Sequence, residues 1–245
     1  MIATRCPAIF PSLCLGLIAT AQAVLSETPA NRFDPARVAT GELDPALAER
    51  GWMLLTKRNV DVTLFRALDP DTIRIHTDRS NALIYREPAP GREPMRPLLT
   101  WEWRVDTWRT GEGTGRDPDW PVVVYAAFDV DRQYIGWWRR LINRVTLGAA
   151  GLPATGKILT YVWSPNETTG RRYPNPYIPK IGFLQVLRSA DEMGKGWFAE
   201  RRDLFVDFES AFDHPAKEVS FIAISADGED SHAAGEAFVR ALRLE

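Results

Sequence analysis

The clearest fold signal in this 245-residue chain is the stretch Leu99-Thr100-Trp101-Glu102-Trp103-Arg104-Val105. Its apolar and polar residues alternate without exception, and successive side chains of a β-strand point to opposite faces. The stretch therefore predicts a strand with one polar face and one heavily apolar face. We expect Trp101 and Trp103 on the apolar face to lie in the core.

Other short stretches with strand patterns are separated by clusters of Gly, Pro, Asp and Asn. Two of them, 122–128 and 219–224, are apolar on both faces, which predicts central strands that are covered on each side. About ten strands and no βαβ alternation predict a single all-β domain, a β-sandwich of two mainly antiparallel sheets. The expected strands are 63–65, 72–76, 82–85, 99–105, 122–128, 157–163, 181–188, 204–208, 219–224 and 237–244.

Two stretches, 45–55 and 135–147, have helical features, so we expect one or two short helices beside the sheets. The first begins behind Asp44, a residue type that caps helices, and should break at Gly51. The second has apolar residues at helical spacing on one face and arginines elsewhere. We favour a helix packed against the sandwich for 135–147. A basic helix lying on a membrane surface is the alternative.

The N-terminus has the features of a secretory signal peptide. Arg5 precedes an apolar stretch, 8–19, and Ala21-Gln22-Ala23 forms a small-x-small cleavage site. The apolar stretch is shorter than the roughly 20 residues that a membrane span needs. We therefore expect residues 1–23 to be a signal peptide, residues 24–245 to be one domain, and the protein to be periplasmic or secreted.

Processing after Ala23 is directly testable. We expect the exported protein to begin at Val24, because the segment before it has the length and composition of a removable signal. The intact mass of the exported protein should lack residues 1–23. A mass that includes these residues would contradict the prediction.

Composition excludes several kinds of chemistry. Both cysteines, Cys6 and Cys14, lie in the segment to be removed, so residues 24–245 can form neither a disulfide nor a thiolate metal site. The 30 basic and 32 acidic residues nearly balance, which indicates no nucleic-acid or anionic-membrane partner. No later stretch is long and apolar enough to predict an integral membrane span after cleavage, and we expect a monomer.

Several motifs stand in the order in which they occur in the domain-of-unknown-function family 3047. The first strand is similar to that family's L-x-W-x-W-[KR]-V motif, and four later segments are similar to its subsequent motifs. One departure is 225–231, where the family carries T-D-T-D-N-T. The resemblance implies an exported bacterial protein with a jelly-roll sandwich of the kind used by carbohydrate-binding modules, and it brings no activity with it. The four later segments are Asp117-Pro118-Asp119-Trp120-Pro121, Leu159-Thr160-Tyr161-Val162-Trp163, Asn175-Pro176-Tyr177 and Glu200-Arg201-Arg202-Asp203.

The segment 106–120 between two expected strands is the candidate ligand site. A connection of this length is typically functional or disordered, and loops on a rigid sandwich are where binding groups gather. Aromatic rings could stack on a sugar while an arginine and two carboxylates orient it. The alternative is an ordered loop that covers a sheet edge. The candidate residues are Trp108, Arg109, Asp117, Asp119 and Trp120.

A second acidic cluster lies at Asp227, Glu229 and Asp230. Carboxylate oxygens are the ligands that Ca²⁺ prefers. A structural calcium ion is therefore a candidate, with Asp117 and Asp119 as further ligands. The alternative is that these residues only form turns and caps. No other cofactor is expected.

The sequence contains neither a Gly-x-Ser-x-Gly elbow nor a His-Glu-x-x-His helix, and His76, His214 and His232 are scattered. Paired carboxylates could still hydrolyse a glycoside. We therefore favour a non-catalytic module that binds a glycan or another small polar ligand. An envelope or extracellular polysaccharide hydrolase, or a structural or partner-binding envelope protein, are the alternatives.

Overall fold

The computed structural model describes residues 43–57, 59–88, 97–111, 119–130 and 156–245. The chain divides into two units, residues 1–30 and 31–245, and every described residue belongs to the second unit. The expected helix at 135–147 lies outside the described residues, as does Asp117.

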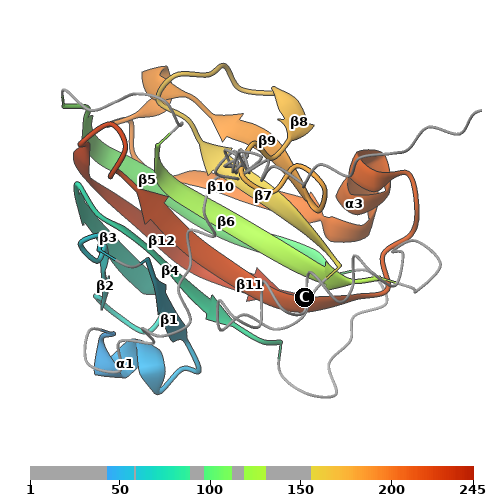
Figure 1. Ribbon diagram of the computed structural model, residues 1–245. Coiled ribbons are helices and arrows are strands. Elements are labelled where there is room, and N and C mark those ends of the chain that lie inside the picture. Colours follow the sequence, from blue (N-terminus) through green and yellow to red (C-terminus); the bar gives the residue numbers. More distant parts are fainter. Residues whose placement is uncertain (1–42, 58, 89–96, 112–118, 131–155) are drawn as a thin grey trace, which may run out of the picture. The chain divides into compact units, whose positions relative to one another are not determined.

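The described part is a two-sheet, jelly-roll-like β-sandwich (Figure 1), as the sequence predicts. Every strand pair is antiparallel except β7 with β9. The seven-stranded sheet has the order β1 (Met53–Thr56), β4 (Asn81–Arg86), β11 (Glu218–Asp227), β6 (Trp120–Asp129), β7 (Lys157–Trp163), β9 (Gly182–Arg188) and β8 (Arg172–Pro174). The five-stranded sheet has the order β10 (Phe198–Asp203), β5 (Leu98–Arg109), β12 (Ala234–Leu244), β3 (Thr72–Asp78) and β2 (Leu64–Ala67).

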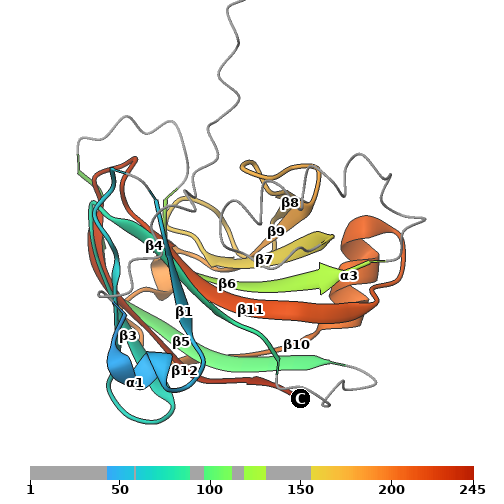
Figure 2. The ribbon, with the colours of Figure 1, turned by 60° about the horizontal axis from the view of Figure 1, so that its bottom comes forward.

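The main core lies between the two sheets, which Figure 2 shows as layers with β5, β10 and β12 beneath β6, β7 and β11. Strand β5 buries every second residue, and Trp101 and Trp103 are 2% and 0% exposed. Their rings meet Tyr161 and Trp163 from β7 of the opposite sheet. The expectation that both tryptophans belong to the core is confirmed.

The central strands of the seven-stranded sheet are buried on both faces, as their continuous apolar sequence predicts. One face of β6 and β11 belongs to the main core, with Val124 and Ile224 among its members. The other face forms separate apolar clusters that include Val123, Phe221 and Ala223. The expectation that these two strands are covered on each side is therefore confirmed.

Helix α1 (Pro45–Ala48) confirms the predicted cap and break, because Asp44 accepts a hydrogen bond from the Ala46 amide and β1 starts soon after Gly51. The chain also has a 3₁₀ turn, η3 (Ala190–Glu192). Among the described residues, no helix is both long and apolar enough to cross a bilayer.

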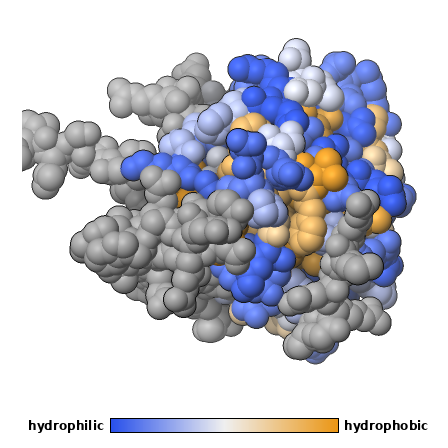
Figure 3. Space-filling view, turned by 90° about the vertical axis from the view of Figure 1, so that its right-hand side faces the viewer, coloured by the Kyte–Doolittle hydropathy of each residue, from blue (hydrophilic) through white to orange (hydrophobic). Residues whose placement is uncertain are grey.

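The prediction of a strand at 204–208 is wrong, because helix α3 (Leu204–Phe212) occupies this segment. Asp203 caps the helix by accepting hydrogen bonds from the Phe205 and Val206 amides, and Leu204 and Phe208 pack into the core from one helical face. Figure 3 views the side of the molecule that carries α3 and shows an apolar area among hydrophilic residues. Val206 of this helix is 61% exposed.

Strand β5 continues to Arg109, four residues beyond its expected end. A register shift opposite β12, where Glu236 pairs with Thr107 and Ala237 with Val105, leaves one residue of β5 unpaired. The bulge reverses the alternation, so Trp108 packs against the core instead of pointing outward. Trp108 lies over Gly235, where an added Cβ would come within 2.7 Å of the indole ring.

Candidate functional site

The structure does not bring the predicted ligand-binding residues into one exposed group. Trp120 is 2% exposed and packs edge-on against Tyr177, so the expectation that it offers a stacking surface is wrong. It begins β6, whose second face is buried in an apolar cluster. Trp108 is half-buried on the core side, Arg109 is exposed, and Asp119 is buried. The binding role of this group stays a prediction.

Three of the predicted acidic residues do meet. One carboxylate oxygen from each of Asp119, Asp227 and Asp230, here called the aspartate cluster, lies within 4.8 Å of the other two. Asp119 immediately precedes β6 and Asp227 ends the neighbouring strand β11, while Asp230 lies in the turn that leads to β12. Glu229 instead forms an ion pair with Lys57.

Asp119 is 3% exposed, and its two oxygens have different environments. Oδ2 accepts hydrogen bonds of 2.6 Å from the amide and the hydroxyl of Ser231. Oδ1 is buried and has no hydrogen-bond donor among the described groups. Burial raises the pKa of Asp119 above its usual value. The hydrogen bonds from Ser231 oppose this rise, the charge of Asp230 adds to it, and a hydrogen bond with Asp227 opposes it. The cluster therefore gathers negative charge in a poorly solvated place.

The remaining buried or half-buried carboxylates of the described segments are engaged elsewhere. Asp44 and Asp203 cap helices. The others each have a cationic side chain beside them. The pairs are Glu102–Arg240, Asp129–Lys217, Glu167–Arg171, Glu192–Arg188, Glu200–Arg188, Asp207–Arg202, Glu218–Lys217, Glu229–Lys57 and Glu236–Arg74.

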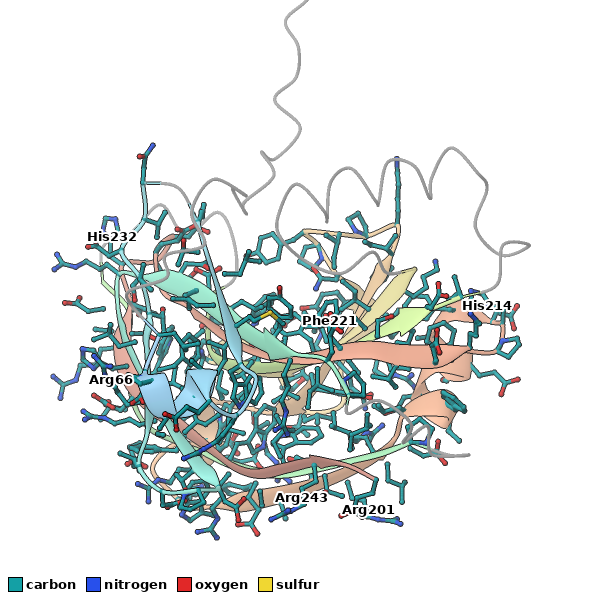
Figure 4. All side chains as sticks on the ribbon, turned by 90° about the horizontal axis from the view of Figure 1, so that it is seen from below. Arg66, Arg201, His214, Phe221, His232 and Arg243 are labelled. Carbon is teal, nitrogen blue, oxygen red and sulfur yellow. The ribbon has the colours of Figure 1, made fainter. Side chains whose placement is uncertain are left out.

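The histidines are scattered in the structure as in the sequence. Figure 4 shows His214 and His232 on opposite sides of the molecule. His76 lies in β3 with Nδ1 2.6 Å from a carboxylate oxygen of Glu236. Hydrogen bonds from Arg74 and His76 hold the pKa of Glu236 below its usual value, although partial burial acts in the opposite direction.

A line of side chains crosses the outer face of the five-stranded sheet. In the registers of neighbouring strands, Arg66 of β2 lies opposite Arg74 of β3. Arg74 lies opposite Phe238 of β12, which in turn lies opposite Arg104 of β5. The Arg104 guanidinium lies 4.9 Å from the centre of the Trp197 ring, just before β10. We call these five residues the Arg–Trp row. Sequence reasoning missed this row because its members come from five separate segments.

This outer face carries more cations than anions. Seven arginines of this sheet lie on it, and four of them pair with Glu236, Asp106, Glu102 and Asp71. Arg66, Arg109 and Arg201 form no ion pair with a described residue, and Figure 4 shows Arg66 and Arg201 on the outside of the sheet. A hollow of about 230 Å³ lies at one end of the row, lined by Leu64, Arg66, Arg74 and His76.

The fold and these two sites define a jelly-roll-like β-sandwich with a basic outer face and a cluster of three carboxylates, two of them buried. A family model described as "Protein of unknown function (DUF3047)" matches residues 52–243, so the chain belongs to this family, as its motifs indicate. A comparison with curated proteins finds no match.

Several solved structures are similar in fold. One is the xyloglucanase domain of NopAA, a type three effector from Sinorhizobium fredii, in complex with cellobiose: 8% identity, coverage of 80% of this chain and 94% of that chain, and a TM-score of 0.44. Another is the catalytic domain of Humicola grisea Cel12A, with 12% identity, 80% and 92% coverage and a TM-score of 0.42. A family 12 xyloglucanase from Bacillus licheniformis has 8% identity, 79% and 85% coverage and a TM-score of 0.41.

Proposed function

We propose that the protein is an exported, non-catalytic binding protein, and that its ligand is an acidic glycan held on the outer face of the five-stranded sheet. The observation that carries the proposal is the Arg–Trp row, in which cations and aromatic rings follow one another across four strands and the residue just before β10. Adjacent strands lie about 4.8 Å apart, so the row extends over roughly 19 Å. A surface of this length suits an extended chain molecule.

The two kinds of side chain in the row suit two features of an acidic sugar polymer. The half-buried Trp197 can stack on the apolar face of a sugar ring. Arg104 and Arg240 lie 4.9 and 4.1 Å from its ring centre and hold the indole in place. A guanidinium binds a carboxylate through two parallel hydrogen bonds. The Arg66 guanidinium is available for such a contact with a ligand, because no acidic residue of the described segments forms an ion pair with it.

Hydrolysis by paired carboxylates is less well supported by the geometry. Glycosidases place two carboxyl groups about 5–5.5 Å or 6.5–9.5 Å apart on either side of a bond that the sugar must bring to them. In the aspartate cluster, Asp119 and Asp227 are only 3% and 8% exposed, so a sugar has little access to them. The other buried and half-buried acids of the described residues pair with cations or cap helices.

Two variants test the location of the site. We expect Arg66→Gln and Trp197→Ala each to weaken binding of oligogalacturonate by about 10-fold, because one charge-assisted hydrogen bond or one aromatic stack is worth on the order of 1–2 kcal/mol. Calorimetry with oligogalacturonate measures this loss. Raised salt should also weaken binding, since the contact is exposed and ionic.

The matched control is Arg172→Gln, which removes an exposed arginine from β8 of the other sheet. We expect this variant to bind like the wild type. If Arg109→Gln loses affinity while Arg66→Gln and Trp197→Ala do not, the segment 106–120 is the site. If the wild type binds no acidic oligosaccharide, the proposed ligand class is wrong.

A further inference from the structure

The hollow at the β2 end of the Arg–Trp row is lined by two guanidinium groups, an imidazole and one apolar side chain. Its volume is about 230 Å³, and it is lined by Leu64, Arg66, Arg74 and His76. All four side chains point away from the core, and Leu64 lies opposite His76 in the register of β2 and β3. Pockets for drug-sized ligands measure about 300–1,000 Å³. The hollow therefore suits one charged group of a larger ligand.

The charges around the hollow leave one cation without a counterion. Glu236 of β12 accepts two hydrogen bonds of 2.7 Å from Arg74 and lies 2.6 Å from Nδ1 of His76. One carboxylate thus serves both of these side chains. Arg66 forms no ion pair with a described residue, so the hollow keeps the capacity to bind an anion.

The contact with Glu236 determines which nitrogen of His76 is left for a ligand. A neutral imidazole has one N–H, and a carboxylate beside Nδ1 favours the tautomer that carries the proton there. Nε2 then has a lone pair, which repels an anion. When the ring takes up a second proton, Nε2 becomes a hydrogen-bond donor and the hollow gains one positive charge.

We propose that the hollow is a subsite for one carboxylate group of the acidic glycan, and that protonation of His76 strengthens the binding. The identity of the ligand in this inference rests on the proposed function. Arg66 and Arg74 supply guanidinium donors at any pH, whereas Nε2 of His76 donates only when the ring is charged. Histidine is the side chain whose charge ordinarily changes between about pH 5 and 8. Binding should therefore tighten as the pH falls through this range.

The other charged groups that face His76 do not account for such a pH dependence. Hydrogen bonds from Arg74 hold the pKa of Glu236 below its usual value, although partial burial opposes this effect and His76 adds to it. Glu236 therefore stays ionised over the whole range. Asp78, the next residue on this face of β3, forms an ion pair with the residue that follows it. The guanidinium groups of Arg66 and Arg74 do not deprotonate in proteins.

The test is calorimetry of the mature full-length protein with oligogalacturonate, at constant ionic strength and at pH values from about 5 to about 8. We expect the wild type to bind about 10-fold more tightly at the acidic end, because one charge-assisted hydrogen bond is gained at an exposed site. His76→Gln should bind equally well across the range. The matched control is His214→Gln, which should keep the wild-type profile, since Figure 4 shows His214 on the opposite side of the molecule from Arg66.

A second readout separates this inference from the proposed function. We expect added sulfate, at the acidic end of the range, to move the NMR signals of the His76 ring, and Arg66→Gln should weaken this response. A wild type that binds oligogalacturonate equally well at every pH, or a His76→Gln variant that keeps the pH dependence, would overturn the inference and leave the proposed function standing.

A wild type that binds no oligogalacturonate at any pH would overturn the proposed function instead. The sulfate response would then decide the inference. A shift of the His76 signals that Arg66→Gln weakens would support an anion subsite in the hollow, and unchanged signals would overturn it.

Discussion

Replacing Trp103 by alanine is expected to lower the free energy of unfolding by about 3–5 kcal/mol. The side chain is fully buried between the sheets, and its ring packs edge-on against Trp101 and Trp163 at centroid distances of 5.5 and 5.6 Å. Its Nε1 donates a 3.0 Å hydrogen bond to Glu200, which also accepts from Arg188. The substitution therefore leaves a large cavity and removes one donor from a half-buried carboxylate.

Chemical denaturation of the variant measures this loss. Trp197→Ala is the matched control, because it removes the same side chain from a half-buried position on the outer face. We expect this control to cost no more than about 1 kcal/mol. A loss below about 1 kcal/mol for Trp103→Ala would show that Trp103 is not buried in the core between β5 and β7.

Asp207→Ala is expected to lower the free energy of unfolding by a comparable amount, about 3–5 kcal/mol. The cause is the loss of an electrostatic partner and not the creation of a cavity. Asp207 is 7% exposed and accepts hydrogen bonds from Arg202 Nε and from the Tyr161 hydroxyl, both at 2.7 Å. These contacts link α3 to β10 and β7. Without the carboxylate, a half-buried guanidinium and a buried hydroxyl lose their acceptor, and such groups are expensive to leave unsatisfied.

The free energy of unfolding, measured by chemical denaturation, tests this prediction too. The control is Glu209→Ala, on the exposed side of the same helix. That control should stay within about 0.5 kcal/mol of the wild type. The double variant with Asp207→Ala and Arg202→Met should lose less stability than the sum of the two single variants. Arg202→Met removes the guanidinium charge that Asp207→Ala leaves without its carboxylate. Additive losses would show that the two side chains do not interact.

Sequence pattern predicts well the parts of this fold in which local and tertiary preferences agree. Period-two alternation places Trp101 and Trp103 in the core, and continuous apolar runs identify β6 and β11 as central strands. Asp44 marks the start of α1 because an N-cap is a local interaction. In each case the deciding contacts lie within a few residues or depend only on which face is apolar.

The wrong predictions come from ambiguity over short distances. The apolar positions at 204–208 fit a strand and a helix alike, and the Asp203 cap with the Leu204–Phe208 spacing decides for α3. A bulge in β5 moves Trp108 to the core side, and no residue pattern before it signals the extra residue. The edge strand β10 was missed because its sequence is mostly polar.

The candidate sites depend on contacts that sequence spacing cannot give. Asp119 and Asp227 lie more than a hundred residues apart and meet only because Trp120 pairs with Asp227 in the ladder of β6 and β11. Local crowding suggested Glu229 as a ligand, whereas the fold turns it toward Lys57. The Arg–Trp row appears only when the registers of the five-stranded sheet are known.

Incubation of the mature protein with polygalacturonate, followed by measurement of both bound protein and polymer length, tests the non-catalytic binding role most directly. The basic outer face predicts saturable, salt-sensitive binding. The buried and half-buried carboxylates outside the aspartate cluster pair with cations or cap helices, which predicts a polymer of unchanged length after prolonged incubation. Shortened polymer would show that the protein is a hydrolase. Binding to a neutral glucan but not to polygalacturonate would show that the arginines of the outer face do not select the ligand.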